Sequence, residues 1–252
     1  MDLGISGRRA AVAAASGGLG LGVARALVAD GAHVAICGRD PGRLAAAVTE
    51  LEALGGGAVH GLAGDVGTIE GAEVFVAEAT SALGGIDILV PNAGGPPPGG
   101  FASTDLAAYA PALELSLLST VAMCVAAVPR MRAQGWGRVV AITSVSVRQP
   151  IPGLILSNTA RAGVTGFLKT LALEVAADGV TVNSVQPGSH ATDRLRSMHG
   201  GDLTGAAASV PTGALGRPND FGAVVAFLCS DQARFITGAA IPVDGGSHRA
   251  LQ

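Results

Sequence analysis

The sequence has 252 residues, 49% of them hydrophobic, and a formal net charge of −3. A chain of this length can bury a large core without disulfides or metals, and its apolar content excludes intrinsic disorder. It has no basic cluster, so the sequence gives no reason to expect a nucleic-acid partner. Glycine is abundant, at 38 residues, but no three-residue period accompanies it, which excludes collagen.

Three further features predict a cytoplasmic protein with no membrane anchor and no bound metal. The first ten residues lack the apolar segment of a signal peptide. The most apolar stretch, Leu117–Val128, is interrupted by two hydroxyl side chains, is too short to cross a bilayer and is expected to be a buried helix. Cys37, Cys124 and Cys229 are odd in number and far apart, which predicts reduced thiols and no zinc site.

Short strand-like runs alternate with longer helical runs along the whole chain. In chain order we predict strand Arg9–Ala14, helix Gly20–Asp30, strand His33–Gly38, helix Pro41–Leu54, strand Ala58–Asp65, helix Thr68–Leu83, strand Ile86–Asn92, a loop over Gly94–Gly100, a mostly helical stretch over Ala107–Ala133, strand Gly137–Ser144, helix Ser157–Ala177, strand Val180–Val185, a long irregular segment over Pro187–Pro211, helix Pro218–Ser230 and strand Ala239–Val243.

This alternation predicts one α/β domain over residues 1–252, with a doubly wound parallel sheet of about seven strands. The predicted strands are apolar on both faces, as expected for a sheet that helices cover on each side. No linker or change in composition divides the chain. The segment 187–211 is longer than an ordinary connection, and long loops of this kind are often lids or binding loops. We therefore expect it to be a substrate or lid loop.

A glycine cluster follows the first predicted strand and opens the first predicted helix, over residues 14–22. Glycines let the backbone pass close to a phosphate, and a helix N-terminus offers free N–H groups and the positive end of the helix dipole. A tight strand–helix turn explains the cluster alone equally well. Its position, however, is that of the dinucleotide-binding fingerprint.

The end of the second predicted strand distinguishes the two nicotinamide cofactors. An acidic residue there would bind the ribose 2′-hydroxyl of NAD, whereas an arginine would accept the 2′-phosphate of NADP. Gly38 is followed by Arg39, and the first acidic residue is Asp40. The planar fork of donors on arginine suits a phosphate. The sequence therefore favours NADP(H) over NAD(H), and a solvated surface arginine is the alternative interpretation.

Seven short motifs follow one another in a fixed order. They are Ser16-Gly17-Gly18-Leu19-Gly20, Asp65-Val66, Asn92-Ala93-Gly94, Thr143-Ser144, Pro187-Gly188 with Thr192, Gly216-Arg217-Pro218 and Pro242-Val243-Asp244-Gly245-Gly246. With these motifs in register, nearly the whole chain resembles the short-chain dehydrogenase/reductase family, nearest to its β-ketoacyl-carrier-protein reductase-like branch. The resemblance implies a single NADP-binding Rossmann-fold domain.

The resemblance also implies the residues that contact the cofactor. These are Ser16, Gly18, Leu19, Gly20, Arg39, Asp65, Val66, Asn92, Ala93, Gly94, Pro187, Gly188 and Thr192. In the family the Asp-Val pair meets the adenine, and the Pro-Gly loop holds the nicotinamide end. One departure lies just before these residues: the family fingerprint begins with Thr-Gly, and here those two positions are Ala13 and Ala14. We expect a slightly altered turn.

The larger departures lie where the family places its catalytic residues. Thr143-Ser144 keeps the catalytic Ser, but the Tyr-x-x-x-Lys pair is replaced by Ser157 and Arg161, which spacing places on one helix face. The single tyrosine, Tyr109, has no lysine four residues later, and Ser116 stands where the supporting Asn is expected.

These replacements predict slow proton delivery. A phenol has a pKa of about 10 and can be tuned towards neutrality, whereas an aliphatic hydroxyl is a weaker acid. Arg161 stays charged, so it can hold a ribose or phosphate but cannot relay a proton. Ser144 and Ser157 can still polarise a carbonyl. His190, beside the Pro-Gly loop, is the other candidate general acid, and a solvent-exposed loop histidine is the interpretation that we favour for it.

Three functions stay open. The first is an NADP(H)-dependent oxidoreductase with an atypical site, the second a non-redox dehydratase, isomerase or cyclase, and the third a catalytically silent binding protein. Product formation without a change in nicotinamide absorbance would distinguish the second from the first, and a blocked pocket would favour the third.

The expected partners are a small-molecule substrate and other copies of the chain. The small residues of 94–100 and 187–211 predict room for a bulky or apolar substrate. The resemblance implies that the apolar helices at 117–128 and 157–177, with the last strand, form the interfaces of a homodimer or homotetramer. Asp193 and Arg194 are expected to form a structural pair and not to take part in catalysis.

Overall fold

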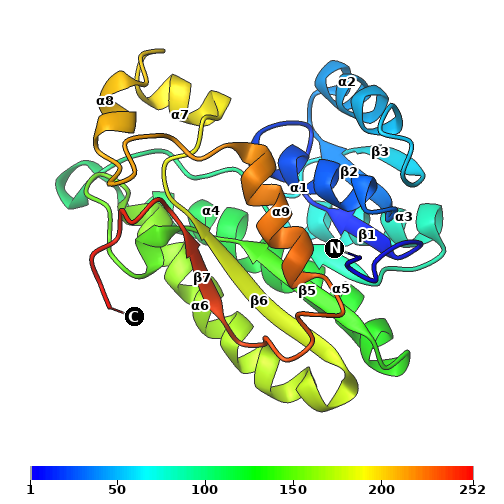
Figure 1. The fold of residues 1–252 in the computed structure, drawn as a ribbon. Helices are drawn as coiled ribbons and strands as arrows, with labels where there is room; N and C mark the ends of the chain where they lie inside the picture. The colour runs from blue at the N-terminus through cyan, green and yellow to red at the C-terminus, as the bar shows by residue number, and fades with distance from the viewer. Residues whose placement is uncertain (1, 252) are drawn as a thin grey trace.

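A computed structural model describes residues 2–251, whose strands form one parallel sheet (Figure 1). The strands are β1 (Arg9–Val12), β2 (His33–Gly38), β3 (Val59–Ala63), β4 (Ile88–Val90), β5 (Gly137–Ile142), β6 (Val180–Pro187) and β7 (Ala240–Val243). Across the seven-stranded sheet they run in the order β3-β2-β1-β4-β5-β6-β7. The order reverses between β1 and β4, the kind of place where doubly wound sheets bind ligands. The predicted fold class is therefore confirmed.

Helices cover both faces of this sheet. In chain order the α-helices are α1 (Gly18–Ala29), α2 (Pro41–Glu52), α3 (Ile69–Leu83), α4 (Tyr109–Leu113), α5 (Ser119–Ala133), α6 (Ile155–Val175), α7 (Asp193–Met198), α8 (Thr204–Ala208) and α9 (Pro218–Leu228), of which α7 and α8 lie away from the sheet (Figure 1). Several begin where a polar residue caps the first turn. Asp40 accepts a hydrogen bond from the backbone N–H of Arg43 at the start of α2, and Thr68 accepts one from Gly71 at the start of α3.

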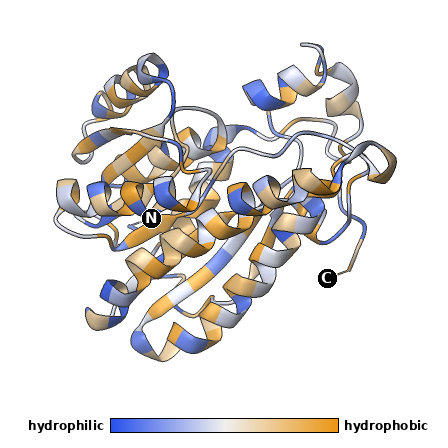
Figure 2. Cartoon of the chain, turned by 180° about the vertical axis from the view of Figure 1, so that it is seen from behind, coloured by the Kyte–Doolittle hydropathy of each residue, from blue (hydrophilic) through white to orange (hydrophobic). Residues whose placement is uncertain are grey.

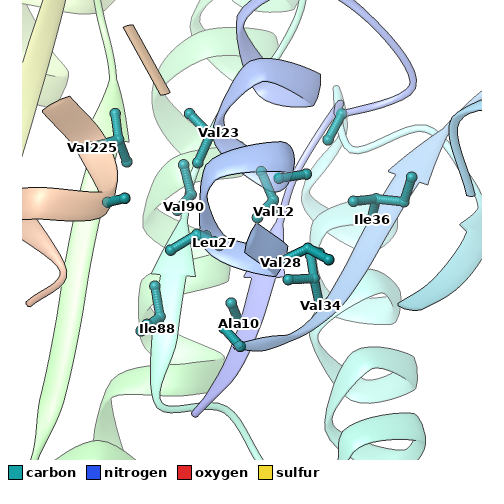
Figure 3. Close-up of a cluster of buried hydrophobic side chains, with 14 of the residues drawn as sticks. Ala10, Val12, Val23, Leu27, Val28, Val34, Ile36, Ile88, Val90 and Val225 are labelled. Atoms are coloured by element: carbon teal, nitrogen blue, oxygen red, sulfur yellow. The ribbon is translucent and has the colours of Figure 1, made fainter. Parts of the chain in front are cut away.

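Each face of the sheet has its own buried core. Residues of α1, α2 and α9 pack on one face, with Leu27 and Val28 lying against Val12 and Val34 (Figure 3). Residues of α3, α5 and α6 pack on the other face. Successive side chains of a strand point to opposite faces, so β2 sends Ile36 to the first core and Cys37 to the second. Figure 2 shows the hydrophobic colour concentrated in the strands between the helices.

The three cysteines lie unpaired inside these cores. Cys37, Cys124 and Cys229 are all buried and free, which agrees with the prediction of reduced thiols. Burial raises the pKa of each thiol to about 12, so the reactive thiolate is scarce at neutral pH. Within residues 2–251 no group of histidine, cysteine or acidic side chains is arranged to hold a metal ion.

Two predicted segments differ from the structure. The segment 187–211 is not irregular throughout, because it contains α7 and α8. Thr192 starts α7 by accepting a hydrogen bond from the N–H of Leu195, and Asp202 accepts one from Thr204 at the start of α8. The predicted helix over 107–133 is interrupted by a π-helical turn at Glu114–Leu118, between α4 and α5.

The helical stretch Leu106–Ala133 is long and apolar enough, by length and composition, to pass for a membrane span. It is longer than the apolar run Leu117–Val128 that the sequence analysis identified. Of its most apolar 18 residues, however, 50% are buried in the fold. Met123 and Cys124 are fully buried, whereas Val125 is 66% exposed. Core helices of folded domains meet the same criteria, and the packing of α5 on α3 and α6 is that of a covering helix.

Asp87 fixes the start of β4 to β1 through a compact hydrogen-bonded cluster. It is 4% exposed, and it accepts hydrogen bonds from the backbone N–H of Arg9 at 2.9 Å, from Arg9 Nη2 at 2.6 Å and from Gln134 Nε2 at 3.0 Å. Burial raises the pKa of Asp87, but the hydrogen bonds and charge of Arg9 outweigh burial and hold that pKa below its ordinary value.

We expect Asp87→Asn to lower the free energy of unfolding at pH 7 by about 2–3 kcal/mol, because it removes the anion of a partly buried pair. A carboxylate with a lowered folded-state pKa contributes its full stability above the unfolded pKa and loses it as the pH falls through the folded one. The difference between wild type and variant should therefore shrink below about pH 4. Urea unfolding at pH 7 and pH 3 measures this difference, with Glu73→Gln as the control, because Glu73 is exposed on α3 and has no ion pair among the described residues. An equal difference at both pH values would contradict the assignment.

Candidate active site

A cavity of about 770 Å³ lies beside the ends of the central strands. It is lined by the turn after β1, the loops that follow β2, β4, β5 and β6, and parts of α6 and α7. The predicted site residues among its lining are Ser16, Gly18, Leu19, Arg39, Asn92, Ala93, Gly94, Ser144, Ser157, Arg161, Pro187, Gly188, His190 and Thr192. The structure thus brings together the predicted nucleotide-binding and catalytic residues around one cavity.

Three predicted cofactor residues do not line this cavity. A Cβ at Gly20 would lie 2.7 Å from the carbonyl oxygen of Ala14, so this glycine permits the close packing of α1 on the turn. Asp65 accepts a hydrogen bond from the N–H of Gly67, and its Oδ2 lies 3.7 Å from Arg39 Nη1. Val66 is buried in the core beside α3. A contact of any of the three with a cofactor stays a prediction.

The turn after β1 depends on an alanine in an unfavourable backbone conformation. Ala14 has a φ of 47° and is the one non-glycine residue with positive φ between residues 2 and 251. Its N–H donates to Cys37 Sγ at 3.2 Å, and its carbonyl oxygen accepts from Asn92 Nδ2 at 3.3 Å. These contacts hold Ala14 in the left-handed conformation that glycine adopts without a steric penalty.

Ala14→Gly is expected to raise the free energy of unfolding by about 1 kcal/mol, because a Cβ in the left-handed region costs about that much. The gain can be measured by urea unfolding. Ala13→Gly is the matched control: Ala13 is buried and has no positive φ, so its replacement should cost about 0.5–1 kcal/mol or more. A loss of stability in Ala14→Gly would show that the alanine methyl group is needed at this turn.

The start of α1 fits a dinucleotide phosphate. Its N-cap, Gly17, provides no side-chain hydrogen bond, and the first three N–H groups of the helix, those of Gly18, Leu19 and Gly20, have no acceptor among the described residues. Unsatisfied N–H groups at a helix N-terminus form an anion-binding site. Arg39 is 76% exposed, and its one charged neighbour within residues 2–251 is Asp65 at 3.7 Å. Both positions can therefore accept a phosphate.

Ser144, Ser157 and Arg161 also line the cavity. Ser144 follows β5, and its Oγ accepts a hydrogen bond from the N–H of Ser146 at 3.1 Å. Ser157, in the first turn of α6, is 8% exposed, and its hydroxyl has no partner within residues 2–251. One turn later, Arg161 Nη1 donates to the carbonyl oxygens of Ile142 at 3.2 Å and Thr143 at 3.0 Å.

Arg161 stays a cation despite its burial. Burial lowers the pKa of its guanidinium to about 10, and the charge of Arg194 acts in the same direction. At neutral pH the group is therefore still protonated, as the sequence predicts. It can hold an oxygen atom or an anion, but it cannot release a proton to a reacting group.

His190 lies inside the protein, so the favoured interpretation of an exposed loop histidine is wrong. It is 5% exposed and packs edge-to-face against Phe221 of α9, with ring centroids 5.2 Å apart. Its Nδ1 lies 3.1 Å from the carbonyl oxygen of Gly188. A carbonyl oxygen only accepts, so Nδ1 carries the proton. Burial lowers the pKa of the ring, which leaves it neutral at pH 7 with Nε2 unprotonated. Its role as a general acid stays a prediction.

Some contacts around the cavity differ from those predicted from the sequence, and others were not predicted. Asp193 pairs with Arg43 at 2.9 Å and not with Arg194, which instead donates to the carbonyl oxygen of Gly95. Sequence reasoning did not assign Arg43 to the site, although it lies four residues after Arg39, in the first turn of α2. Ser116 is buried in the π-helical turn, and its hydroxyl has no partner among the described residues.

The topology and the open start of α1 are those of a Rossmann-type nucleotide-binding fold. The chain belongs to the short-chain dehydrogenase/reductase family, in its β-ketoacyl-carrier-protein reductase-like branch: residues 13–248 match the family model described as enoyl-(acyl carrier protein) reductase. It is 36% identical to nodulation protein G of Azospirillum brasilense, over 96% of this chain and 98% of that protein. It is 32% identical to a 3-oxoacyl-[acyl-carrier-protein] reductase of Aquifex aeolicus, over 98% and 99% of the two chains.

A solved structure supports the same assignment. L-sorbose reductase from Gluconobacter frateurii, complexed with NADPH and L-sorbose, is similar to this chain with a TM-score of 0.92 and 33% identity over 100% of both chains. The fold and the arrangement of the sheet are therefore those of a family of oxidoreductases that act on carbonyl and alcohol groups.

Proposed function

We propose that the protein is an NADP(H)-dependent oxidoreductase that interconverts a carbonyl and an alcohol, with Ser157 and Arg161 in place of the family's Tyr and Lys. The observation that carries the proposal is the single cavity. It joins the free N–H groups of α1 and the exposed Arg39 to Ser144, Ser157 and Arg161. The relatives include an acetoacetyl-CoA reductase of Cupriavidus necator, 32% identical over 96% of this chain and 98% of that protein.

The cofactor would be held along one side of this cavity. The N–H groups of Gly18 and Leu19 would receive its central phosphates, and Arg39 its 2′-phosphate. Thr192, whose methyl group lies 3.7 Å from where a Cβ of Gly18 would be, would close the cavity over this turn. When bound, NADPH supplies a hydride to a carbonyl carbon.

The chain's own groups would act on the carbonyl oxygen. The hydroxyls of Ser144 and Ser157 would donate hydrogen bonds to it, and the positive charge of Arg161, one helical turn from Ser157, would stabilise at longer range the negative charge that develops there. The alkoxide oxygen would then take its proton from cavity water that exchanges with bulk solvent, because the tunable phenol that serves the family as general acid is absent. Slow turnover is the expected consequence.

Titration of the purified protein with NADPH and NADH, followed by nicotinamide fluorescence, tests the cofactor half of the proposal. We expect tighter binding of NADPH. A panel of carbonyl compounds, monitored by NADPH absorbance and by product mass, tests the chemical half. Binding of neither cofactor, or no turnover of any compound with NADPH bound, would count against an oxidoreductase.

A non-redox function is the second candidate, and the chemistry at Ser157 and Arg161 favours it. Ser157 offers no acidic phenol, and Arg161 is a cation at neutral pH that suits stabilisation of an enolate or another oxyanion. A dehydratase or isomerase would form product without oxidising NADPH, so product mass and absorbance, read in the same reaction, separate the two functions. The open cavity weighs against a silent binding protein, for which a blocked pocket is expected.

We further propose that the protein forms a homodimer or homotetramer through α5, α6 and the β7 edge. Val125 is 66% exposed, Leu173 is 74% exposed and Phe235, before β7, is 99% exposed. Sedimentation equilibrium should therefore give a mass of two or four chains, and Leu173→Glu should lower it by placing a charge on the α6 face. Glu70→Gln, on α3, is the control. A monomeric wild type would contradict the proposal.

A further inference from the structure

Two arginines, Arg161 and Arg194, line the cavity. Arg161 is held at the end of β5 and Arg194 at Gly95, in the loop after the neighbouring strand β4, and the charge of Arg194 lowers the pKa of Arg161. Neither forms an ion pair with an acidic side chain of residues 2–251. The cavity contains two carboxylates, but Asp193 pairs with Arg43 and Asp40 caps α2.

Two arginines without acidic partners in one cavity are unfavourable when no anion is bound. A buried cation costs free energy unless a charge or a full set of hydrogen bonds compensates it. Arg161 uses Nη1 for the carbonyl oxygens of Ile142 and Thr143, and its Nε and Nη2 have no acceptor among the described residues. Arg194 lies in the first turn of α7, where the helix dipole disfavours a cation. Arg194 is exposed to solvent, so it is the burial of Arg161 that the stability of the fold does not explain.

The donors that remain free match an anion. Arg194 uses Nη1 for the carbonyl oxygen of Gly95 at 3.3 Å, and its other donors have no partner within residues 2–251. A guanidinium can hold both oxygens of a carboxylate in one plane. Arg161 is bonded to the end of β5 and follows Ser157 by one turn, and Arg194 is bonded to the loop after the neighbouring strand β4. Arg39 and the start of α1 are at the proposed phosphate end.

We propose that the substrate is an oxo acid or hydroxy acid whose carboxylate is bound by Arg161 and Arg194 while its carbonyl or alcohol faces Ser144 and Ser157. This inference rests on the proposed function, which it deepens by naming a substrate class. It differs from the bulky or apolar substrate expected from the small loop residues, because the loop that carries Arg194 brings a cation to the cavity. Arg194, on the predicted lid, would be the specificity-determining residue.

The experiment compares 2-oxo and 3-oxo carboxylic acids with their methyl esters as substrates, followed by NADPH oxidation. Wild type should prefer the acids. Arg194→Gln should reduce the acid-over-ester ratio of kcat/KM at least tenfold, mainly through KM, and Arg194→Lys should retain part of the preference. Arg196→Gln is the matched control, because Arg196 is exposed on the same helix and does not line the cavity.

A binding measurement separates this inference from the redox reaction. With NADPH present, malonate, a carboxylate with no reducible carbonyl, should raise the melting temperature of wild type and of Arg196→Gln, but not of Arg194→Gln. If malonate binds in this way while no carbonyl compound is reduced, the anion site stands and the proposed oxidoreductase function falls. If esters are used as well as acids, or if Arg194→Gln chiefly weakens NADPH binding, the arginine pair does not recognise a substrate carboxylate and the inference is overturned.

Discussion

Replacing Ser157 by Tyr and Arg161 by Lys together is expected to raise kcat for carbonyl reduction by about 10²–10⁴-fold, the usual contribution of a general acid. The pair restores the acidic phenol that the family uses, with a lysine cation one turn away to lower its pKa. Ser157 faces a cavity of about 770 Å³, so the added ring has space to enter. NADPH oxidation with a fixed carbonyl substrate, at saturating cofactor, measures the gain.

The matched control is Ser157→Phe with Arg161→Lys, which adds the same ring without its hydroxyl group. This variant should show no gain, and a circular dichroism spectrum like that of wild type would establish that both variants fold. If the Tyr and Phe variants bind NADPH and turn over at the same rate, proton delivery does not limit the reaction. The proposed reason for slow turnover would then be wrong, and the missing Asn at Ser116 would be the next position to restore.

The alternation of strand-like and helical runs along the chain was sufficient to predict the sheet, but it did not fix where the elements end. The run Val34-Ala35-Ile36-Cys37 is apolar on both faces and lies between the two cores. The predicted strand Arg9–Ala14 stops at Val12, because Ala14 turns into the left-handed region. The helices of 187–211 depend on single capping side chains such as Thr192, a signal that is weak in so polar and glycine-rich a segment.

Most residues of the predicted motifs line one cavity, because each motif lies at the end of a strand or the start of a helix and the sheet brings these ends together. Contacts between distant segments were not predictable. The pairing of Arg43 with Asp193 joins α2 to α7, and it depends on how the segment after β6 folds back. Similarly, His190 is buried because Phe221 of α9 packs against it, which its neighbours in sequence do not reveal.

Arg39→Ala is expected to weaken NADPH binding by about 10–100-fold and to leave NADH binding nearly unchanged, since one or two hydrogen bonds to a charged group contribute about 1.5–3 kcal/mol. The side chain is 76% exposed, and its charged neighbour Asp65 is 3.7 Å away, so the guanidinium is free to meet a phosphate and is not needed for the fold. The NADPH preference of wild type should also fall as salt concentration rises, because an exposed ion pair is screened.

Fluorescence titration with both cofactors at two salt concentrations measures these effects. Arg217→Ala is the control, because Arg217 is comparably exposed, at 78%, but pairs with Asp220 and does not line the cavity. Its removal should change neither dissociation constant. Equal weakening of NADPH and NADH by Arg39→Ala would place Arg39 against the part that the cofactors share. If Arg39→Ala changes the binding of neither cofactor, Arg43 becomes the candidate for binding the 2′-phosphate. Arg43 lies beside the glycine turn, with its Nη2 2.8 Å from where a Cβ of Gly17 would be.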